Sequence, residues 1–584
     1  MAEDEGERTR ADPTRTDPPA GLVIALLAVC GLCYLGQDFS AWAWPALDGY
    51  PAIERWLDPG FLTHDFYTNT TDRYGVDTWQ AILFGGVQRL TGVPYGATIA
   101  VLTALRLLAF PAVIFAFLSA LTGRTAALLG VTLAVLANFN LPHTLGWQWL
   151  WGDGSPAMFA AIAATGAWAL LLHRKVWLSL LLMAAAAIFQ PLVAVHGGMV
   201  FALVFAFDFD GRERVKALTW PANLAAGAVF LAAFLSQYVL LSPAPSERLA
   251  NLEYIRILVW ERHPTDFLPS RFKPDEVRAF FVAALGVAVM LARVWSTLPR
   301  RRLIVAALAA YAGLCLVGWV FVELRPVRLA ADLIPYRTAV FGAPILLAII
   351  ATFASEAYRA RAVVPLGLLF LAFVLAGPLA EAVQVPGIVP ALMLLAASLA
   401  GPTLTLAPMA RLSRLVGTPM WLLAGAALAG QGALAASHRQ AAMSLPDPSN
   451  QHPVYAWAKT RTETAATFLI EQKPSDRAYG LALSPQRMRL IGRRAVVASM
   501  DFPFADRDLR AWRTTWAAGL DHGRRDFVET ANAQRIAQVC RELPFDYLIR
   551  TRPLAGATPV AQFAPSNGVA AVLVYRPCVA QGLR

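Results

Sequence analysis

The chain has 584 residues, of which 57% are hydrophobic and 15% charged, and its mean hydropathy is +0.49. This composition excludes a single soluble domain and a disordered protein, and it predicts a polytopic membrane protein. The formal net charge of +11 is spread over the chain without a dense basic run, which argues against a nucleic-acid-binding protein.

The distribution of charged residues divides the chain into three parts. Nine lie in residues 1–20, 48 in residues 21–437 and 32 in residues 438–584. We therefore predict a disordered cytoplasmic tail over 1–20, a transmembrane domain over 21–437 and a water-facing domain over 438–584.

The first apolar run begins at Gly21 and is not followed by a clear signal-peptide cleavage site, so we interpret it as a retained membrane helix. Further apolar stretches suit twelve more membrane spans. These stretches cover 96–120, 125–140, 156–172, 176–189, 192–207, 219–241, 279–297, 303–322, 339–355, 362–380, 387–408 and 417–436. The predicted fold class is mainly α: a polytopic helical bundle of about thirteen spans, followed by a small α/β domain.

Basic residues gather in the short loops on one side of the predicted bundle, and the positive-inside rule makes that side cytoplasmic. An odd number of spans then places residues 438–584 outside, together with the loops 38–95, 140–155, 242–278 and 322–338. The spans near 176 and 192 are short and joined by Gln190 and Pro191, so the sequence leaves thirteen and eleven spans open. Either count puts the C-terminal domain on the extracytoplasmic side.

The C-terminal part alternates between helical and strand patterns. We predict helices near 456–472 and 525–541, and strands at 479–483, 495–499, 545–549 and 571–575. Cys540 and Cys578 lie at the ends of the last helix and the last strand, where a disulfide and two free thiols are both open interpretations. The other cysteines, Cys30, Cys33 and Cys315, lie in predicted spans and are interpreted as packing residues.

The first outside loop is unusually acidic. Between Asp38 and Asp77 it carries seven acidic residues against two basic ones. Carboxylates at a membrane surface can deprotonate an acceptor hydroxyl or hold a divalent metal against a phosphate leaving group. Asp58 and Asp65 are framed by apolar and aromatic residues, which indicates partial burial and makes them our candidate catalytic residues. A turn or helix-capping role is the alternative for both, and it is natural for Asp58, which precedes a proline.

The second outside loop, NFNLPHTLGWQWLWGDGSP, places three tryptophans at alternating positions before an aspartate. An interfacial aromatic belt explains the tryptophans, but aromatic faces also stack on sugar rings. His143, Trp147 and Asp153 are therefore candidate substrate-binding residues, with the belt as the alternative.

The third and fourth outside loops are rich in arginine. A guanidinium at the outer leaflet can bind a lipid-linked phosphate through its bidentate fork. We select Arg337 and Arg262, together with the adjacent His263, as candidate donor phosphate-binding residues. Headgroup snorkelling is the alternative for any single arginine there. Arg106 lies inside a span, where a charge is costly, and is expected to face the bundle interior.

These features together resemble the GT-C class of integral-membrane glycosyltransferases. The resemblance rests on a first span followed at once by a long acidic outside loop, about a dozen more spans and a C-terminal extracytoplasmic α/β domain. The pieces LDPGFLTHDFY, FQPLVAVHGG, ERHPTDFLPSRF, LIPYR and ASMDFPFADRDLRAW look like those of a family of bacterial multispanning membrane proteins. The GT-C resemblance implies a polyprenyl-phosphate-linked sugar as donor, Asp65 as catalytic acid residue with Asp58 second, and Arg337 or Arg262 at the donor phosphate.

The sequence departs from several GT-C families because its first loop has no adjacent acidic pair. It therefore leaves open whether a divalent cation, Mg²⁺ or Mn²⁺, takes part. The leading hypothesis is transfer of a sugar from a polyprenyl-phosphate donor to the hydroxyl of a glycan or lipid acceptor, at the outer face of a bacterial inner membrane. The alternatives are a transporter or flippase of a lipid-linked glycan and a non-catalytic envelope assembly protein.

Overall fold

The computed structural model describes most of the chain. The described residues are 18–38, 44–71, 79, 81–138, 156–241, 248–262, 264–333, 336, 339–377, 385–404, 418–439, 452–470, 484–498, 506–520, 533–565 and 571–580. Residues 1–17 of the predicted N-terminal tail and the strand expected at 479–483 lie outside them.

All thirteen apolar stretches that the sequence marks as spans form helices. In the first half these are α1 (Ala20–Asp38), α6 (Tyr95–Thr122), α7 (Arg124–Leu136), α8 (Pro156–Leu172), α9 (Val176–Phe189), α10 (Pro191–Asp208) and α12 (Pro221–Leu241). In the second half they are α15 (Pro274–Arg293), α16 (Arg301–Gly318) with its π-helical continuation η5 (Trp319–Leu324), α18 (Ala339–Arg359), α19 (Val363–Ala376), α21 (Ile388–Ala400) and α22 (Thr418–Arg439).

The helices differ in length. Among the described residues, three are long and apolar enough to cross a membrane: α6, α10 and α16 together with η5. A fourth span arises if α11 (Gly211–Thr219) and α12, which bend by 68° at Trp220, are one unit. Seven shorter apolar helices pack beside them. The chain is thus a multi-pass integral membrane protein, whereas the count of thirteen spans stays a prediction.

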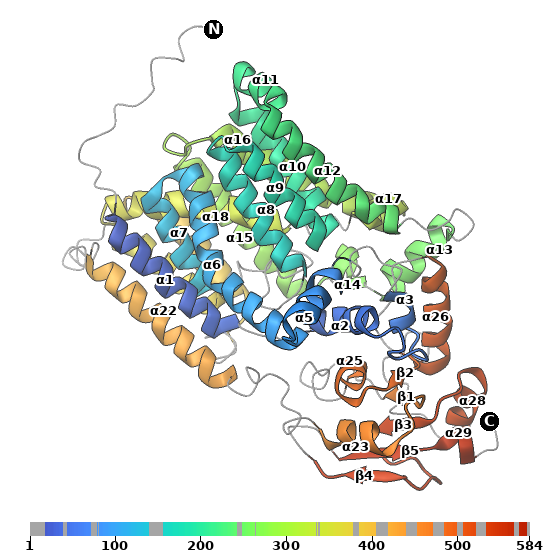
Figure 1. The fold of residues 1–584 in the computed structure, drawn as a ribbon. Helices are drawn as coiled ribbons and strands as arrows, with labels where there is room; N and C mark the ends of the chain where they lie inside the picture. Colours follow the sequence, from blue (N-terminus) through green and yellow to red (C-terminus); the bar gives the residue numbers. More distant parts are fainter. Residues whose placement is uncertain are drawn as a thin grey trace.

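The helices form one bundle with a continuous apolar core (Figure 1). Glycines let backbones approach closely: a Cβ on Gly31 of α1 would lie 2.9 Å from the carbonyl oxygen of Leu108 in α6. Likewise, Gly36 of α1 meets Gly432 of α22, where a Cβ would lie 3.1 Å from the carbonyl oxygen. Small residues at such crossings are typical of membrane helices, since packing replaces the hydrophobic effect as the driving force there.

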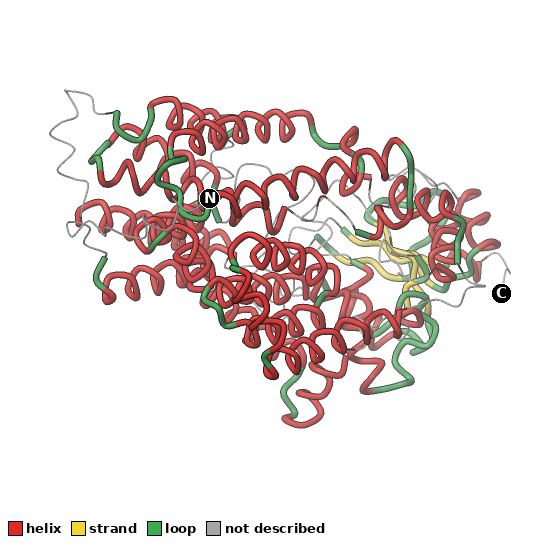
Figure 2. The backbone as a smooth tube through the Cα atoms, turned by 90° about the horizontal axis from the view of Figure 1, so that it is seen from above, coloured by secondary structure: helices red, strands yellow, loops and turns green. Residues whose placement is uncertain are grey.

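A mixed five-stranded sheet forms the centre of the C-terminal part, at one end of the bundle (Figure 2). Its strands are β1 (Thr467–Ile470), β2 (Ala495–Val496), β3 (Tyr547–Arg550), β4 (Ala561–Phe563) and β5 (Val572–Tyr575), in the order β2-β1-β3-β5-β4. β1 runs parallel to β2 and β3, and β5 runs antiparallel to β3 and β4. The α/β class expected from the sequence is confirmed.

The predicted helix 456–472 is wrong in its second half. The helix α23 (Pro453–Arg461) ends before Thr462, and β1 begins at Thr467. The apolar run at 466–470 fits a helix face and a strand equally well by its pattern, and pairing decides between them. Phe468 lies opposite Tyr547 in the register, and their rings stack with centroids 5.0 Å apart.

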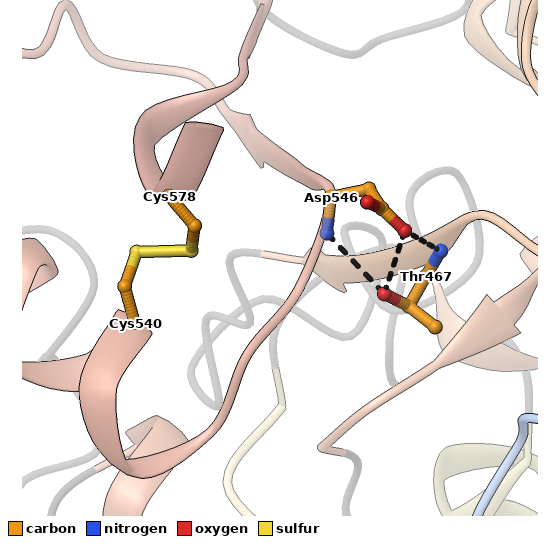
Figure 3. The surroundings of a disulfide bond; sticks show 4 residues. All are labelled: Thr467, Cys540, Asp546 and Cys578. Carbon is orange, nitrogen blue, oxygen red and sulfur yellow. Dashed lines mark hydrogen bonds between the residues drawn. A yellow bond between two sulfur atoms is a disulfide. The ribbon is translucent and has the colours of Figure 1, made fainter. Parts of the chain in front are cut away.

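Helix α23 packs against one face of the sheet, and α28 (Ala533–Glu542) and the short α29 (Pro577–Ala580) pack against the other. The helix α26 (Asp506–Leu520) packs against the outside loops. Cys540 at the end of α28 and Cys578 in α29 form a disulfide (Figure 3). Of the two interpretations that the sequence left open, the structure has the disulfide. Beside it, the carboxylate of Asp546 accepts hydrogen bonds from the backbone nitrogen and hydroxyl of Thr467, at 2.9 and 3.0 Å, which join the starts of β1 and β3.

Candidate functional site

The first outside loop is a folded unit. It comprises α2 (Trp44–Leu57), a turn and the one-turn helix α3 (Thr68–Thr71). Tyr50, Ile53 and Phe61 are buried in a small apolar cluster that also includes Phe84 and the start of α6. The guanidinium of Arg55 donates to the carbonyl of Leu62 at 3.2 Å and to the side-chain oxygen of Asn69 at 2.7 Å, and so ties the turn to the helix that precedes it.

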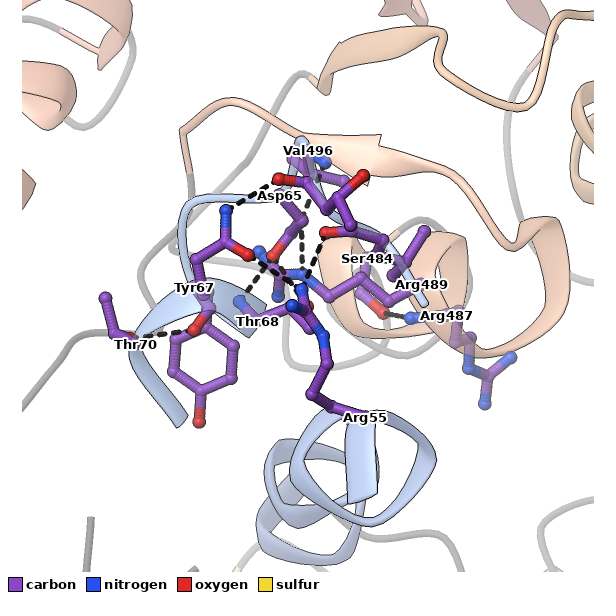
Figure 4. A network of polar contacts seen from close by, with 12 residues as sticks. Arg55, Asp65, Tyr67, Thr68, Thr70, Ser484, Arg487, Arg489 and Val496 are labelled. Atoms are coloured by element: carbon purple, nitrogen blue, oxygen red, sulfur yellow. Dashed lines mark hydrogen bonds and ion pairs between the residues drawn. The ribbon is translucent and has the colours of Figure 1, made fainter. Parts of the chain in front are cut away.

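Asp65 lies at the centre of this loop, fully buried, and both of its oxygens are occupied (Figure 4). One oxygen accepts from the backbone nitrogen of Thr68 at 2.7 Å and from its hydroxyl at 2.9 Å. The other accepts from Nε of Arg489 and from the backbone nitrogen of Val496, both at 2.8 Å. The last two donors belong to the C-terminal domain, so Asp65 joins that domain to the first loop.

This environment bears on the role predicted for Asp65. A general base needs a free acceptor position that a substrate proton can reach. Arg489, only 1% exposed at its side chain, covers one side of the carboxylate, and Thr68 holds the other. Base catalysis by Asp65 would therefore require the contact between Asp65 and Arg489 to open. The catalytic role of Asp65 remains a prediction from the sequence.

Asp58 occupies the opposite kind of position. It follows α2 directly and is exposed, with one oxygen accepting from the backbone nitrogen of Gly60 at 2.9 Å. This is the turn role that the sequence offered as the alternative. Glu54, the neighbouring carboxylate, pairs with Arg493 of the C-terminal domain at 3.3 Å. Asp58 thus remains the loop carboxylate that is open to solvent and has no ion pair among the described side chains.

A second contact joins the C-terminal domain to the third and fourth outside loops. Asp506, at the start of α26 and fully buried, accepts from both terminal nitrogens of Arg328, at 2.5 and 2.7 Å. It also accepts from the backbone nitrogen of Leu249 at 2.6 Å. Arg328 lies over the ring of Tyr254, 4.0 Å from its centroid, and burial and the nearby Asp332 carboxylate raise the pKa of Tyr254.

Exposed ion pairs extend this contact along α26. Arg510 meets Glu253, and Arg513 meets Glu261, each with two nitrogens within 2.9 Å of the carboxylate oxygens. Hydrogen bonds from Arg510 lower the pKa of Glu253. Because these pairs are bidentate, they fix the direction of α26 more than isolated surface pairs do.

Three outside loops and the C-terminal domain meet in one apolar cluster. Its members come from the third loop, the fourth loop and α26, and Phe66 of the first loop packs against them. They include Ile255, Phe267, Val322, Ala331, Leu509 and Trp512. A small pocket beside it, lined by Phe66, Tyr67, Arg489 and Trp512 among others, has room for about one water molecule and is too small for a sugar.

The remaining predicted site residues are placed less completely. Arg262 ends the π-helix η3 (Arg256–Arg262), but its side chain is outside the described part of the structure. His263 and Arg337, and the three residues of the second loop, His143, Trp147 and Asp153, lie outside the described residues. Their proposed phosphate and sugar contacts therefore remain predictions.

Two polar residues within the bundle are buried, and the burial of one of them, Arg106, was predicted. Arg106 is 6% exposed and its guanidinium carbon lies 5.8 Å from the ring centroid of Phe159, so it faces the bundle interior as predicted. His196 is 3% exposed, and its Nε2 lies 2.9 Å from the carbonyl oxygen of Leu333, in the fourth outside loop. Gln190 lies at the break between α9 and α10, where its extended backbone separates the two helices.

Arg489, Arg328 and Asp506 were not predicted from the sequence as interface residues. The one sequence feature near these described residues that could have indicated an interface is the Asp-Arg-Asp run at the start of α26. Acidic residues are common at the start of any helix, so this run does not single out an interface. Among the described residues, no group of three or more His, Cys, Asp or Glu side chains is arranged to hold a metal ion.

No protein-family model matches the chain, and no curated protein matches it in sequence. Solved structures of membrane glycosyltransferases do match it in fold. One of them is oligosaccharyltransferase AglB from Archaeoglobus fulgidus, in complex with an inhibitory peptide and a dolichol-phosphate. The match covers 90% of this chain and 69% of the AglB chain, with 11% sequence identity and a TM-score of 0.45. The chain is similar over most of its length to GT-C glycosyltransferases.

Structures of two further proteins show the same likeness. ArnT from Cupriavidus metallidurans, in the apo state, matches 96% of this chain and 98% of its own, with 13% identity and a TM-score of 0.43. Another structure of ArnT contains bound undecaprenyl phosphate. Arabinofuranosyltransferase AftD from Mycobacteria matches 96% of this chain and 42% of its own, with 15% identity and a TM-score of 0.44. The likeness is one of architecture, and the activities and ligands are those of the three similar proteins.

Proposed function

We propose that the chain is a membrane glycosyltransferase that moves a sugar from a polyprenyl-phosphate donor to an acceptor hydroxyl. The observation that carries the proposal is the meeting of the first, third and fourth outside loops with α26 in one cluster. It places an acidic loop and two arginine-rich loops together at one end of the bundle. Acceptor activation and phosphate stabilisation, the two requirements of the reaction, are properties of these loops.

In this proposal Asp58 is the general base and Asp65 is a positioning residue. The Asp58 carboxylate takes the proton of the acceptor hydroxyl as the acceptor oxygen bonds to the anomeric carbon. The bond between that carbon and the phosphate oxygen breaks, and the lipid phosphate leaves with its negative charge. Arg337, Arg262 and His263 stabilise this charge, while His143, Trp147 and Asp153 contact the sugar.

The reaction is assigned to the extracytoplasmic face of a bacterial inner membrane, with the N-terminus cytoplasmic. Basic residues in the loops at the opposite end of the bundle support this orientation. They include Arg174, which pairs with Asp208 and Glu213 at 2.6 and 2.9 Å, and Arg300, which pairs with Asp208 at 2.7 Å.

The test is transfer of radiolabelled sugar from a panel of polyprenyl-phosphate sugars by the purified full-length protein in lipid. We expect Asp58→Asn to reduce turnover at least a hundredfold while donor binding persists, since general acid–base groups contribute about 10²–10⁴-fold. The matched control is Asp275→Asn, which removes a 92% exposed carboxylate from the third outside loop and should leave turnover unchanged.

Two results would overturn parts of the proposal. A folded Asp65→Asn variant without turnover, beside a fully active Asp58→Asn variant, would transfer the base role to Asp65. Movement of a lipid-linked glycan across the bilayer, with no transfer from any donor, would replace the enzyme by a transporter.

A further inference from the structure

The helix α11 lies at the end of the bundle opposite the five-stranded sheet (Figure 1). It continues into α12 through a bend of 68° at Trp220. Membrane-crossing helices tilt by about 20° on average from the bilayer normal. A helix bent by 68° from such a neighbour therefore runs closer to the plane of the bilayer than to its normal.

Ion pairs and a capping box hold α11 in this direction. Asp208, at the end of α10, pairs with Arg174 and Arg300 at 2.6 and 2.7 Å. The Asp210 carboxylate accepts from the backbone nitrogen of Glu213 at 2.7 Å, and the Glu213 carboxylate accepts from that of Asp210 at 3.1 Å. Glu213 also pairs with Arg174 at 2.9 Å. The three acidic residues around α11 thus already have partners.

The opposite face of α11 is apolar and basic. Val215 and Leu218 lie one helical turn apart, and each is 62% exposed. Arg212 and Lys216 are exposed beside them and form no ion pair with the side chains that the structure describes. An apolar strip flanked by unpaired cations is typical of a helix at the boundary between water and anionic lipid.

Exposed tryptophans mark this boundary on the neighbouring helices. Trp177 at the start of α9, Trp220 before α12 and Trp295 after α15 are 42%, 53% and 44% exposed. Lys216 lies over the ring of Trp220, 5.9 Å from its centroid, and Arg301 lies over that of Trp295 at 5.5 Å. Tryptophans gather where a membrane meets water. Because Trp220 directly follows α11, the helix lies at the level of these tryptophans.

We propose that α11 is a surface helix that binds anionic phospholipids of the bilayer. Val215 and Leu218 enter the boundary of the acyl chains, and Arg212 and Lys216 contact the lipid phosphates. Two apolar side chains are too few for a stable protein–protein interface, which buries about 1,200–2,000 Å². The inference goes beyond sugar transfer, and only the assignment of this leaflet as the cytoplasmic one rests on the orientation proposed above.

The experiment uses the full-length protein in phosphatidylcholine nanodiscs that contain a small share of photoreactive phosphatidylglycerol or photoreactive phosphatidylcholine. Crosslinked peptides are mapped by mass spectrometry. We expect phosphatidylglycerol to crosslink to residues 211–220 at least tenfold more than phosphatidylcholine does, and Arg212→Gln/Lys216→Gln to abolish this preference. The matched control is Lys459→Gln/Arg461→Gln, which removes two exposed cations from α23 and should leave the preference unchanged.

A second measurement reports the depth of α11 in the bilayer. An environment-sensitive fluorophore is attached to Leu218→Cys in a Cys315→Ala background, where the remaining free cysteines, Cys30 and Cys33, are buried. We expect blue-shifted emission that a spin-labelled phospholipid quenches. The same fluorophore at Thr460→Cys, an exposed position of α23, should emit as in water and resist the quencher.

Several outcomes would overturn the inference. Equal crosslinking by the two lipids, an unchanged preference in Arg212→Gln/Lys216→Gln, or water-like emission at position 218 would each do so. Suppression of the crosslinks by inorganic phosphate would replace the lipid surface by a phosphate site. A dimer in solution that Leu218→Asn separates would assign the face to a second copy of the chain. Crosslinking as expected, without sugar transfer from any donor, would count against the proposed function alone.

Discussion

Nε of Arg489 donates to the carboxylate of Asp65 over 2.8 Å, although the two residues are 424 positions apart in the sequence. Both side chains are almost completely buried, and the guanidinium also lies over the ring of Tyr67, 4.9 Å from its centroid. This ion pair fixes the acidic first loop against the C-terminal domain. Any movement of one with respect to the other must break it.

We expect Asp65→Asn to destabilise the contact between the first outside loop and the C-terminal domain by about 3–5 kcal/mol, because it leaves the buried guanidinium of Arg489 without its counter-charge. The double variant Asp65→Asn/Arg489→Met should recover part of this loss, since it removes the unpaired charge as well. Limited proteolysis of the C-terminal domain and thermal unfolding would measure both. Asp58→Asn, at an exposed carboxylate, is the control and should unfold as the wild type does.

Arg328→Lys should weaken the attachment of α26 to the fourth outside loop. A lysine replaces two hydrogen bonds to Asp506 by one and loses the stacking on Tyr254. Hydrogen bonds to charged groups contribute about 1.5–3 kcal/mol, so the expected loss is of that order. Amide hydrogen exchange over 506–520 would report it. Arg325→Lys changes an exposed arginine of the same loop and should leave the exchange rates as they are.

Reduction of the Cys540–Cys578 disulfide should lower the melting temperature of the C-terminal domain. The bond closes a sequence separation of 38 residues, and loss of a native disulfide from a small domain costs about 2–5 kcal/mol. The double variant Cys540→Ser/Cys578→Ser should show the same loss and no further response to reductant. An equal melting temperature with and without reductant would contradict the prediction.

His452 should make the stability of the C-terminal domain depend on pH. Burial lowers the pKa of His452 from 6.5 to about 4, because the folded state disfavours the charged imidazole. The unfolded chain therefore binds the proton more readily between these values, and stability is full above about pH 6.5 and is lost as the pH falls towards 4.

The measurement is thermal unfolding between pH 4 and 7 for the wild type and His452→Asn. Nδ1 of His452 accepts from the backbone nitrogen of Val454 at 3.3 Å, at the start of α23, and an asparagine can supply the same cap. The variant should be less sensitive to acid in this range. Parallel pH profiles for the two proteins would assign the sensitivity to other groups.

The helices and the α/β class of the C-terminal domain could be predicted from the order of the amino acids. Apolar segments such as 96–120 and 339–355 appear in the structure as α6 and α18, since a segment in lipid must satisfy its own backbone hydrogen bonds. Burial of Arg106 followed from the same reasoning. The short β1 at Thr467–Ile470 could not be predicted in this way, because a run of four residues is too short to show a period, and only its pairing with β2 and β3 makes it a strand.

The pairing of the charged residues could not be predicted in this way and became visible in the folded chain. The sequence marked Asp58 and Asp65 alike as framed carboxylates, and folding left Asp58 exposed at a turn and buried Asp65 beside Arg489. It likewise joined Arg328 to Asp506 across 178 residues. Local patterns record whether a residue is buried, but ion pairing depends on which of the chain's 50 lysines and arginines the fold brings within about 3 Å of a carboxylate.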